Sequence, residues 1–231
     1  MRNAATGMPH AHEADGHAAP HADPVSFWEA RYSERDQIWS GRVNAVLADA
    51  VASLPPGRAL DLGCGEGGDV VWLAEQGWDV VGVDISPTAV NRGQAAARSR
   101  RLTDRVHFLV VDLSDTAALG EDLGGFDLVA ASFLQSPMEL DRARILRAGA
   151  ALVAPGGHLL VTSHAAPPPW ASSEHLAAFR PITPESELTA LGLDPTAWET
   201  VVAEIRTRVA VSPDGERAEL LDCVVLIRRA A

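Results

Sequence analysis

The chain has 231 residues, of which 47% are hydrophobic and 22% are charged. This composition is typical of a globular protein with enough apolar residues to build a core. The formal net charge is −12, and so acidic a surface repels phosphate backbones, which argues against nucleic acid as a partner. No apolar run is long enough to span a membrane or to act as a signal peptide. With only two cysteines, Cys64 and Cys223, we expect a protein of a reducing compartment, the cytoplasm.

Residues 1–24 differ from the rest of the chain. They are rich in Ala, His, Gly and Pro and have no hydrophobic period, so they cannot bury enough apolar surface to offset the entropy of ordering. We expect a disordered tail, followed by a single domain over residues 25–231. A metal-binding histidine tract is the alternative interpretation, but the spacing is irregular and no cysteine accompanies it, so no metal site is predicted. The histidines of the tail are His10, His12, His17 and His21.

From residue 24 onward, short apolar runs alternate with Ala-rich segments of helical spacing. The predicted strands are residues 58–62, 79–83, 106–110, 126–132 and 158–163. The predicted helices are residues 69–76, 87–99, 115–122 and 139–153, preceded by two helices over 27–33 and 42–54. This alternation indicates right-handed βαβ units and an α/β fold with a doubly wound, Rossmann-like sheet.

The last third of the chain has a different pattern. A short helix over residues 184–191 precedes two long alternating stretches, residues 198–211 and 216–229. They are joined by Ser-Pro-Asp-Gly at 212–215, and Asp-Gly between alternating runs is a strong hairpin signal. We therefore predict seven strands, mostly parallel, with an antiparallel C-terminal hairpin at one edge of the sheet.

A glycine-rich segment lies where the first strand turns into a helix. Gly63, Gly65 and Gly68 satisfy the spacing G-x-G-x-x-G, which is typical of dinucleotide-binding loops. Glycine lets the backbone approach a ligand closely, and the helix N-terminus offers free amides. By itself, this spacing is a weak signal.

Carboxylates around this segment distinguish between possible ligands. In a doubly wound sheet they all lie at the carboxyl ends of the strands, where ligands bind. Phosphates would be repelled there, whereas a ligand with an ammonium and a sulfonium group would be attracted. Charge complementarity therefore favours S-adenosylmethionine over NAD. The carboxylates are Asp61, Glu66, Asp69, Asp84 and Asp112.

Four motifs in order resemble those of the class I S-adenosylmethionine-dependent methyltransferases. They are DLGCGEG at 61–67, VDIS at 83–86, VDL at 111–113 and FDLV at 126–129, and Pro-Gly-Gly at 155–157 adds the usual turn. The resemblance covers residue 27 to the C-terminus. The segments WEARY at 28–32 and WSGRVN at 39–44 are similar to the small-molecule branch near the tellurite-resistance and thiopurine methyltransferases.

The resemblance implies roles for the matched residues. Asp61 and the loop residues Gly63, Cys64 and Gly65 would hold the methionine part of the cofactor. The side chain of Cys64 is interpreted as a small packing group rather than a nucleophile. Asp84 would accept from both ribose hydroxyls. The remaining cofactor-binding residues are Ile85 on the adenine face, Asp112 and Leu113 at the adenine edge, Ser132 and Phe133 near the sulfonium, and Trp39 and Gly41 closing over the cofactor. Asp61 as a structural cap, and Asp84 and Asp112 as solvated strand ends, remain alternative interpretations.

The implied reaction is an in-line transfer of a methyl group to a small molecule, with S-adenosylhomocysteine as the product. Positioning and desolvation accelerate such a transfer without any acid or base. Should a base be needed, His164 at the end of the fifth strand is the candidate, with a purely structural histidine as the alternative. Two other functions stay open. An NAD-dependent oxidoreductase is disfavoured because Tyr32 is the only tyrosine and no lysine exists, and a non-catalytic S-adenosylmethionine-binding protein has the same fold.

Overall fold

The computed structural model describes residues 23–231, except residues 121, 122, 124 and 213. The predicted tail, with its four histidines, therefore lies outside the described residues apart from its last two positions. Asp23 caps the first helix, α1 (Pro24–Ser33), because its side chain accepts hydrogen bonds from the backbone amide and the hydroxyl of Ser26. Within the described residues, the first helix thus begins at Pro24.

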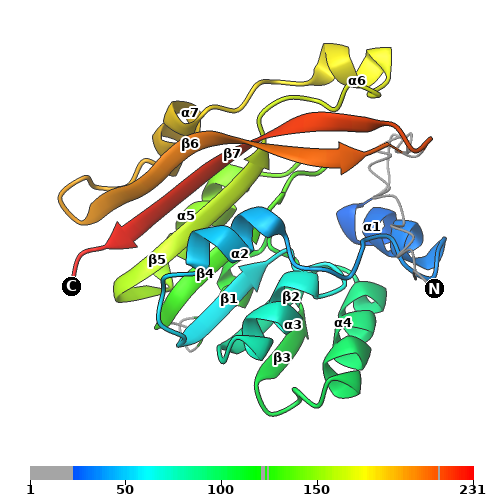
Figure 1. The fold of residues 1–231 in the computed structure, drawn as a ribbon. Helices are drawn as coiled ribbons and strands as arrows, with labels where there is room; N and C mark the ends of the chain where they lie inside the picture. The colour runs from blue at the N-terminus through cyan, green and yellow to red at the C-terminus, as the bar shows by residue number, and fades with distance from the viewer. Residues whose placement is uncertain (1–22, 121–122, 124, 213) are drawn as a thin grey trace, which may run out of the picture.

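One seven-stranded sheet runs through the molecule, in the order β3-β2-β1-β4-β5-β7-β6 (Figure 1). The first five strands pair in parallel, while β7 pairs antiparallel with β5 and with β6. The predicted fold class and the C-terminal hairpin are thereby confirmed. The strands are β1 (Arg58–Leu62), β2 (Asp79–Asp84), β3 (Val106–Val110), β4 (Phe126–Ser132), β5 (Val153–His164), β6 (Trp198–Val211) and β7 (Arg217–Arg229).

Helices cover both faces of this sheet, as a doubly wound fold requires. The core on one face is built with α2 (Ala45–Val51), α3 (Gly68–Glu75) and α4 (Pro87–Ser99). The core on the other face is built with α5 (Arg142–Ala151) and α7 (Pro184–Leu191). The central strands are buried on both faces, which explains the nearly continuous apolar runs of β1 and β4.

Three elements differ from the sequence predictions. The helix predicted over 115–122 is a short 3-10 helix, η1 (Thr116–Leu119), because Gly120 adopts a positive φ of 57° that ends it. β5 begins at Val153 and includes the Pro-Gly-Gly segment, where the register with β4 shifts. A further helix, α6 (Ser173–Ala178), follows the proline-rich loop. These differences lie away from the ends of β1 and β2, where the site was predicted.

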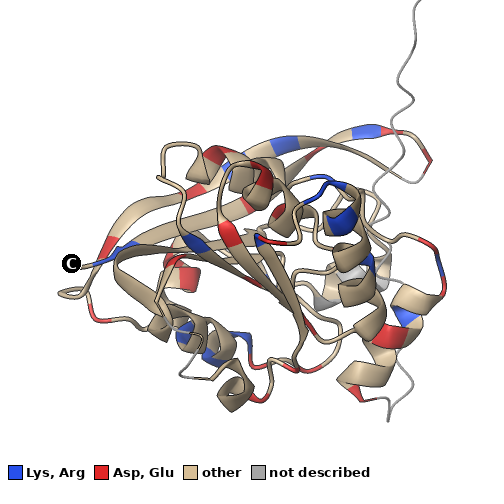
Figure 2. Cartoon of the chain, turned by 90° about the horizontal axis from the view of Figure 1, so that it is seen from below, with Lys and Arg blue, Asp and Glu red and all other residues tan. Residues whose placement is uncertain are grey.

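Charges are interspersed over the ribbon (Figure 2). Two arginines between the end of α4 and the start of β3 are in ion pairs, Arg100 with Glu75 and Arg105 with Asp79. Within the described part of the chain, no helix is long and apolar enough to cross a membrane. The same residues contain no group of three or more His, Cys, Asp and Glu that could hold a metal ion.

Candidate functional site

The loop after β1 is folded back onto the end of β2. The backbone amides of Gly63 and Cys64 both donate to the carbonyl oxygen of Val83, at 2.9 Å. Gly63 and Gly65 have φ values of 73° and 52°, in the left-handed region that favours glycine. The turn itself therefore requires glycine at these positions. The backbone of the loop crosses the carboxyl ends of the parallel strands β1 and β2.

Asp84 joins this loop to the start of α4. Its Oδ2 accepts from the amide of Gly65 and its Oδ1 from the amide of Ser86, both at 2.9 Å. Burial raises the pKa of Asp84, and these backbone hydrogen bonds offset part of the rise. The sequence prediction placed Asp84 at a strand end beside the glycine loop, and the structure places it there with only 7% of its surface exposed.

Asp61, Asp69 and Asp84 form a cluster of carboxylates, which we call the carboxylate cluster. The pKa of Asp61 is raised by burial and then by the charges of Asp69 and Asp84. Burial also raises the pKa of Asp69, and the hydrogen bond that the Asn44 amide donates to its Oδ1 offsets part of that rise. None of these three carboxylates forms an ion pair with an arginine that the structure describes. The cluster therefore holds negative charge that a cationic ligand would offset.

Cys64 packs inward from the same loop. A Cβ built on Gly82 of β2 would lie 3.0 Å from its sulfur, and its side chain packs against the apolar core on that face. Burial and the neighbouring charges of Asp61 and Asp84 raise the pKa of this thiol well above its ordinary value. The thiol is therefore protonated at neutral pH, so Cys64 contributes its backbone to the site rather than a nucleophile.

Residues 29–44, which we call the N-terminal cap, are tied to the glycine loop through Glu66. The Glu66 carboxylate accepts from the amides of Ile38 and Trp39, at 3.1 and 2.8 Å to Oε2, and pairs with Arg92 at 2.8 Å. Arg92 in turn donates to the backbone carbonyl oxygens of Tyr32 and Arg35. One buried carboxylate and one arginine thus hold the cap in place.

The cap brings two aromatic side chains over the glycine loop. The indole of Trp39 donates to the Tyr32 hydroxyl at 3.0 Å, and a Cβ built on Gly65 would lie 3.0 Å from that hydroxyl and 3.1 Å from the indole nitrogen. The predicted position of Trp39 next to the loop is therefore what the structure has. At the first turn of the cap, Glu29 accepts from the side chains of Ser86 and Thr88 at the start of α4.

A cavity of about 320 Å³ lies on the outer side of the glycine loop. Gly41 lines it together with Gly67 and Gly68 of the loop and Arg92 of α4. Of the residues assigned to the cofactor from the sequence, only Gly41 is among its lining residues. The cavity is therefore distinct from the ends of β1 and β2, where the carboxylate cluster lies.

The end of β3 extends the site beside β2. The amide of Val111 donates to the carbonyl oxygen of Asp84 at 2.9 Å, which places Asp112 next to the end of β2. The side chain of Asp112 accepts from the amide of Ser114 at 2.9 Å, while Leu113 is buried in the core. Ile85 is half-buried. These three predicted residues thus share one edge of the site with Asp84.

The end of β4 carries the second group of predicted residues. Ser132 is near Asp69, and Phe133 follows with φ 53°, an unusual value for a residue other than glycine. The ring of Phe133 stacks on the imidazole of His164 at the end of β5, with the ring centroids 4.2 Å apart and the planes at 20°. Phe133 and His164, predicted separately, therefore form one contact.

The loop after β4 is anchored by a buried ion pair. Arg142 of α5 donates through Nε to the carbonyl oxygen of Leu134 and pairs through Nη1 with Glu187 of α7 at 2.8 Å. Ser163 of β5 donates to Glu187 and accepts from Arg142, at 2.8 and 2.6 Å. Every charged oxygen and the hydroxyl of this network have partners, so the loop that carries Phe133 is firmly positioned.

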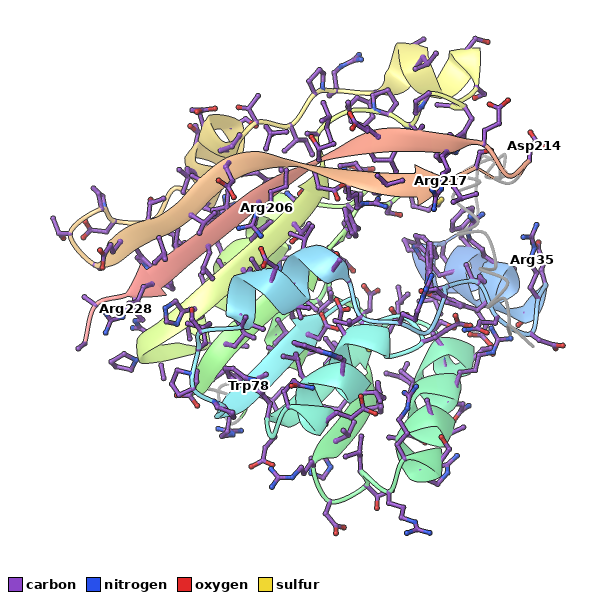
Figure 3. The ribbon with its side chains drawn as sticks, viewed as in Figure 1. Arg35, Trp78, Arg206, Asp214, Arg217 and Arg228 are labelled. Atoms are coloured by element: carbon purple, nitrogen blue, oxygen red, sulfur yellow. The ribbon has the colours of Figure 1, made fainter. Side chains whose placement is uncertain are left out.

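Several residues of the site were missed by sequence reasoning. Tyr32 is buried next to Asp84, and burial is the main cause that raises its pKa. Asp222 of the C-terminal hairpin faces His164, and Arg208 of the same hairpin pairs with Asp222. One signal was available, because Asp222 is a lone carboxylate inside the apolar run 220–227. Their neighbour Arg206, labelled in Figure 3, points from β6 towards α2 and donates to Asp49.

The comparisons with known proteins agree with this arrangement. The sequence profile of the family described as "Methyltransferase domain" matches residues 60–159. A demethylmenaquinone methyltransferase from Beutenbergia cavernae is 32% identical over 175 residues, which are 74% of this chain and 65% of that protein. A 2-heptyl-1-hydroxyquinolin-4(1H)-one methyltransferase from Mycobacteroides abscessus is 38% identical over 126 residues, which are 52% of each. The chain spans less than two thirds of the length of these relatives.

Solved structures with the same fold cover nearly the whole chain. One, from a study of the conversion of a disulfide bond into a thioacetal group during echinomycin biosynthesis, has a TM-score of 0.67 at 23% identity and covers 89% of this chain and 92% of that one. Another is the magnesium protoporphyrin IX methyltransferase from Synechocystis PCC 6803 with bound S-adenosylhomocysteine, with a TM-score of 0.59 at 19% identity. It covers 92% of this chain and 90% of that one. At such identities the likeness is one of fold.

Proposed function

We propose that the chain is a class I methyltransferase and that it transfers a methyl group from S-adenosylmethionine to a small-molecule acceptor. The proposal rests above all on the carboxylate cluster. Asp61, Asp69 and Asp84 are held together at the ends of β1 and β2 with no described cation to offset them. A ligand that carries an ammonium and a sulfonium group supplies the missing positive charge.

The residues around the glycine loop fit such a cofactor. Asp84 would accept from the ribose hydroxyls, and the backbone between Gly63 and Gly65, with Asp61 beneath it, would hold the methionine part. Ile85, Asp112 and Leu113 would surround the adenine, and Trp39 would cover the loop. When bound, S-adenosylmethionine supplies an activated methyl group on a sulfonium. The chain's own part is to bind, to orient and to exclude water.

A small-molecule acceptor is supported by the relatives. The two named above act, by their names, on demethylmenaquinone and on a hydroxyquinolone. The net charge of −12 disfavours a polyanion such as RNA. Both cysteines are free thiols, so we propose the cytoplasm as the location. The narrower likeness to the tellurite-resistance and thiopurine branch stays a prediction.

Two parallel calorimetric titrations test the cofactor. Tag-free protein is titrated with S-adenosylhomocysteine and, separately, with NADH. We expect micromolar or tighter binding of the former and none of the latter. Binding of NADH alone would favour the oxidoreductase alternative, because the charge argument would have failed.

Turnover separates an enzyme from a non-catalytic binding protein. Methyl transfer from labelled S-adenosylmethionine is measured with phenols, thiols, amines, purified RNA and protein as acceptors. We expect transfer to small molecules. Robust transfer to RNA or protein alone contradicts the proposed acceptor class, and cofactor binding without any transfer supports the binding-protein alternative.

A further inference from the structure

His164 and Asp222 are direct partners across two antiparallel strands. They are opposite each other in the pairing of β5 with β7, so their side chains lie on the same face of the sheet. Nδ1 of His164 is 3.5 Å from Oδ1 of Asp222. The imidazole is at the carboxyl end of β5 with 24% of its side chain exposed, whereas Asp222 is completely buried. A buried carboxylate thus faces one nitrogen of an accessible histidine.

The two oxygens of Asp222 are used differently. Oδ2 accepts from Nε of Arg208 at 2.5 Å, whereas Oδ1 accepts no hydrogen bond from any residue that the structure describes. An oxygen buried without a hydrogen bond is costly, and the imidazole nitrogen is the group placed to approach it.

His164 is restrained from two other sides. Its backbone amide donates to the side-chain oxygen of Gln135 at 2.9 Å, and its ring stacks on Phe133. The guanidinium of Arg208 lies 5.5 Å from the centre of the Phe133 ring. Among the described side chains, Asp222 from β7 faces the imidazole directly, and Arg208 from β6 lies across the Phe133 ring. Both come from the hairpin, outside the part of the chain that the family profile matches.

We propose that His164 is the general base of the reaction and that Asp222 is its positioning residue, so that the acceptor is a hydroxyl compound. This inference rests on the proposed methyl transfer. A carboxylate facing Nδ1 favours the tautomer that carries its proton there, which leaves Nε2 to accept a proton. The imidazole stacks on Phe133, which the family resemblance assigns to the surroundings of the sulfonium, and we therefore place Nε2 on the acceptor side of the proposed site.

The chemistry of the acceptor explains the need for a base. A thiol has an ordinary pKa of about 8.5 and ionises partly by itself at neutral pH, whereas a phenol, with an ordinary pKa of about 10, does not. The proton of the acceptor hydroxyl passes to Nε2 of His164. A lone pair of that oxygen forms the bond to the methyl carbon as the electron pair of the broken carbon–sulfur bond stays on sulfur. His164 then releases the proton to water.

Kinetics with two phenols of different acidity test the base. Methyl transfer to 4-nitrophenol and to the less acidic 4-methylphenol is measured in wild type and in His164→Gln, with thiophenol and benzylamine alongside. We expect the variant to lose about 100-fold or more in kcat/KM with 4-methylphenol and much less with 4-nitrophenol, and to recover as pH rises and the phenolate forms. His107→Gln, on the exposed face of β3, is the matched control.

The tautomer of His164 gives a readout that needs neither cofactor nor acceptor. Nitrogen-15 chemical shifts of the ring are expected to report the proton on Nδ1 in wild type and a shift of the population towards Nε2 in Asp222→Asn. Because that variant leaves Arg208 buried without its partner, the double variant Arg208→Gln with Asp222→Asn is measured as well. It replaces the charged pair with two amides that can bond to each other. Unchanged tautomer populations in both variants overturn the role of Asp222.

The outcomes separate this inference from the proposed function. Equal rates of wild type and His164→Gln with both phenols, or transfer to thiophenol or benzylamine only, overturn the hydroxyl acceptor and leave the methyltransferase standing. Absence of S-adenosylhomocysteine binding in wild type, by contrast, removes the proposed function and with it this inference. The expected pattern of rates together with the tautomer shift supports the roles of His164 and Asp222.

Discussion

Oδ2 of Asp84 accepts a hydrogen bond from the amide of Gly65 at 2.9 Å, and this bond ties the end of β2 to the glycine loop that follows β1. The same carboxylate accepts from Ser86 at the start of α4. One side chain therefore organises the loop and also faces the proposed ribose position.

Asp84→Asn is expected to bind S-adenosylhomocysteine at least about 100-fold more weakly, because hydrogen bonds to a charged group contribute about 1.5–3 kcal/mol each. Isothermal calorimetry measures the change. Asp79→Asn at the other end of β2, exposed and paired with Arg105, is the matched control and should bind like wild type. Equal affinities of the two variants would remove Asp84 from the cofactor site.

The raised pKa of Asp61 predicts a specific dependence of stability on pH. The folded chain keeps a proton on Asp61 at pH values where the unfolded chain has released it. The free energy of unfolding therefore falls as pH rises from the ordinary pKa through the raised one. Asp61→Asn should lose this slope and be more stable than wild type above the raised pKa.

Chemical denaturation of Asp61→Asn across this pH window measures the change, and Asp214→Asn at the exposed hairpin tip is the control. The same variant should bind S-adenosylmethionine more weakly, because one of the carboxylates that offsets the ligand's charge is gone. A variant that is less stable than wild type at neutral pH would contradict the repulsion within the carboxylate cluster.

Glu66→Gln should loosen the N-terminal cap. The amides of Ile38 and Trp39 and the guanidinium of Arg92 would lose a charged acceptor, so we expect S-adenosylhomocysteine affinity to fall about tenfold, which corresponds to about 1.4 kcal/mol. Trypsin cleavage within residues 29–44 should be faster. Glu75→Gln, which removes an exposed ion pair with Arg100, serves as the comparison. Cleavage at the wild-type rate would show that Glu66 does not hold the cap.

Gly65→Ala should destabilise the glycine loop in two ways, through backbone strain and through steric overlap with the N-terminal cap. Its φ of 52° costs a non-glycine residue about 1–2 kcal/mol, and the new Cβ would press on Tyr32 and Trp39. We expect lower stability and loss of cofactor binding. Gly215→Ala, with φ 88° and no atom within 4 Å, carries the strain alone and should keep full binding. Thermal unfolding and calorimetry on both variants separate the two effects.

Glu187→Ala should destabilise the fold by about 3–5 kcal/mol, because it leaves the buried guanidinium of Arg142 without its carboxylate. Denaturant titration measures this loss. Glu185→Ala, two residues away on the exposed surface of α7, should change stability little. Comparable losses in the two variants would mean that the effect comes from helix α7 rather than from the ion pair.

Sequence reasoning succeeded where structure follows from neighbouring residues. The strand before Gly63, the turn that its glycines make and the position of Asp84 at the end of β2 all follow from short-range patterns. The hydrogen bond from the Ile38 amide to Glu66 joins residues 28 positions apart in the sequence. Asp222 faces His164, 58 positions away, because their two strands are paired. No local period predicts such contacts. For the same reason, no sequence pattern indicates that Phe133 adopts a positive φ and stacks on His164.

The register between β5 and β7 determines which residue of β7 lies opposite His164 on the acceptor side of the site. Side chains alternate between faces along a strand, so a slip of one residue would place Cys223 opposite His164 and turn Asp222 to the other face. The same slip would also shift the pairing of β7 with β6, in which Asp222 is opposite Arg206. The contact between His164 and Asp222 therefore depends on the number of residues in β7 as much as on the carboxylate itself.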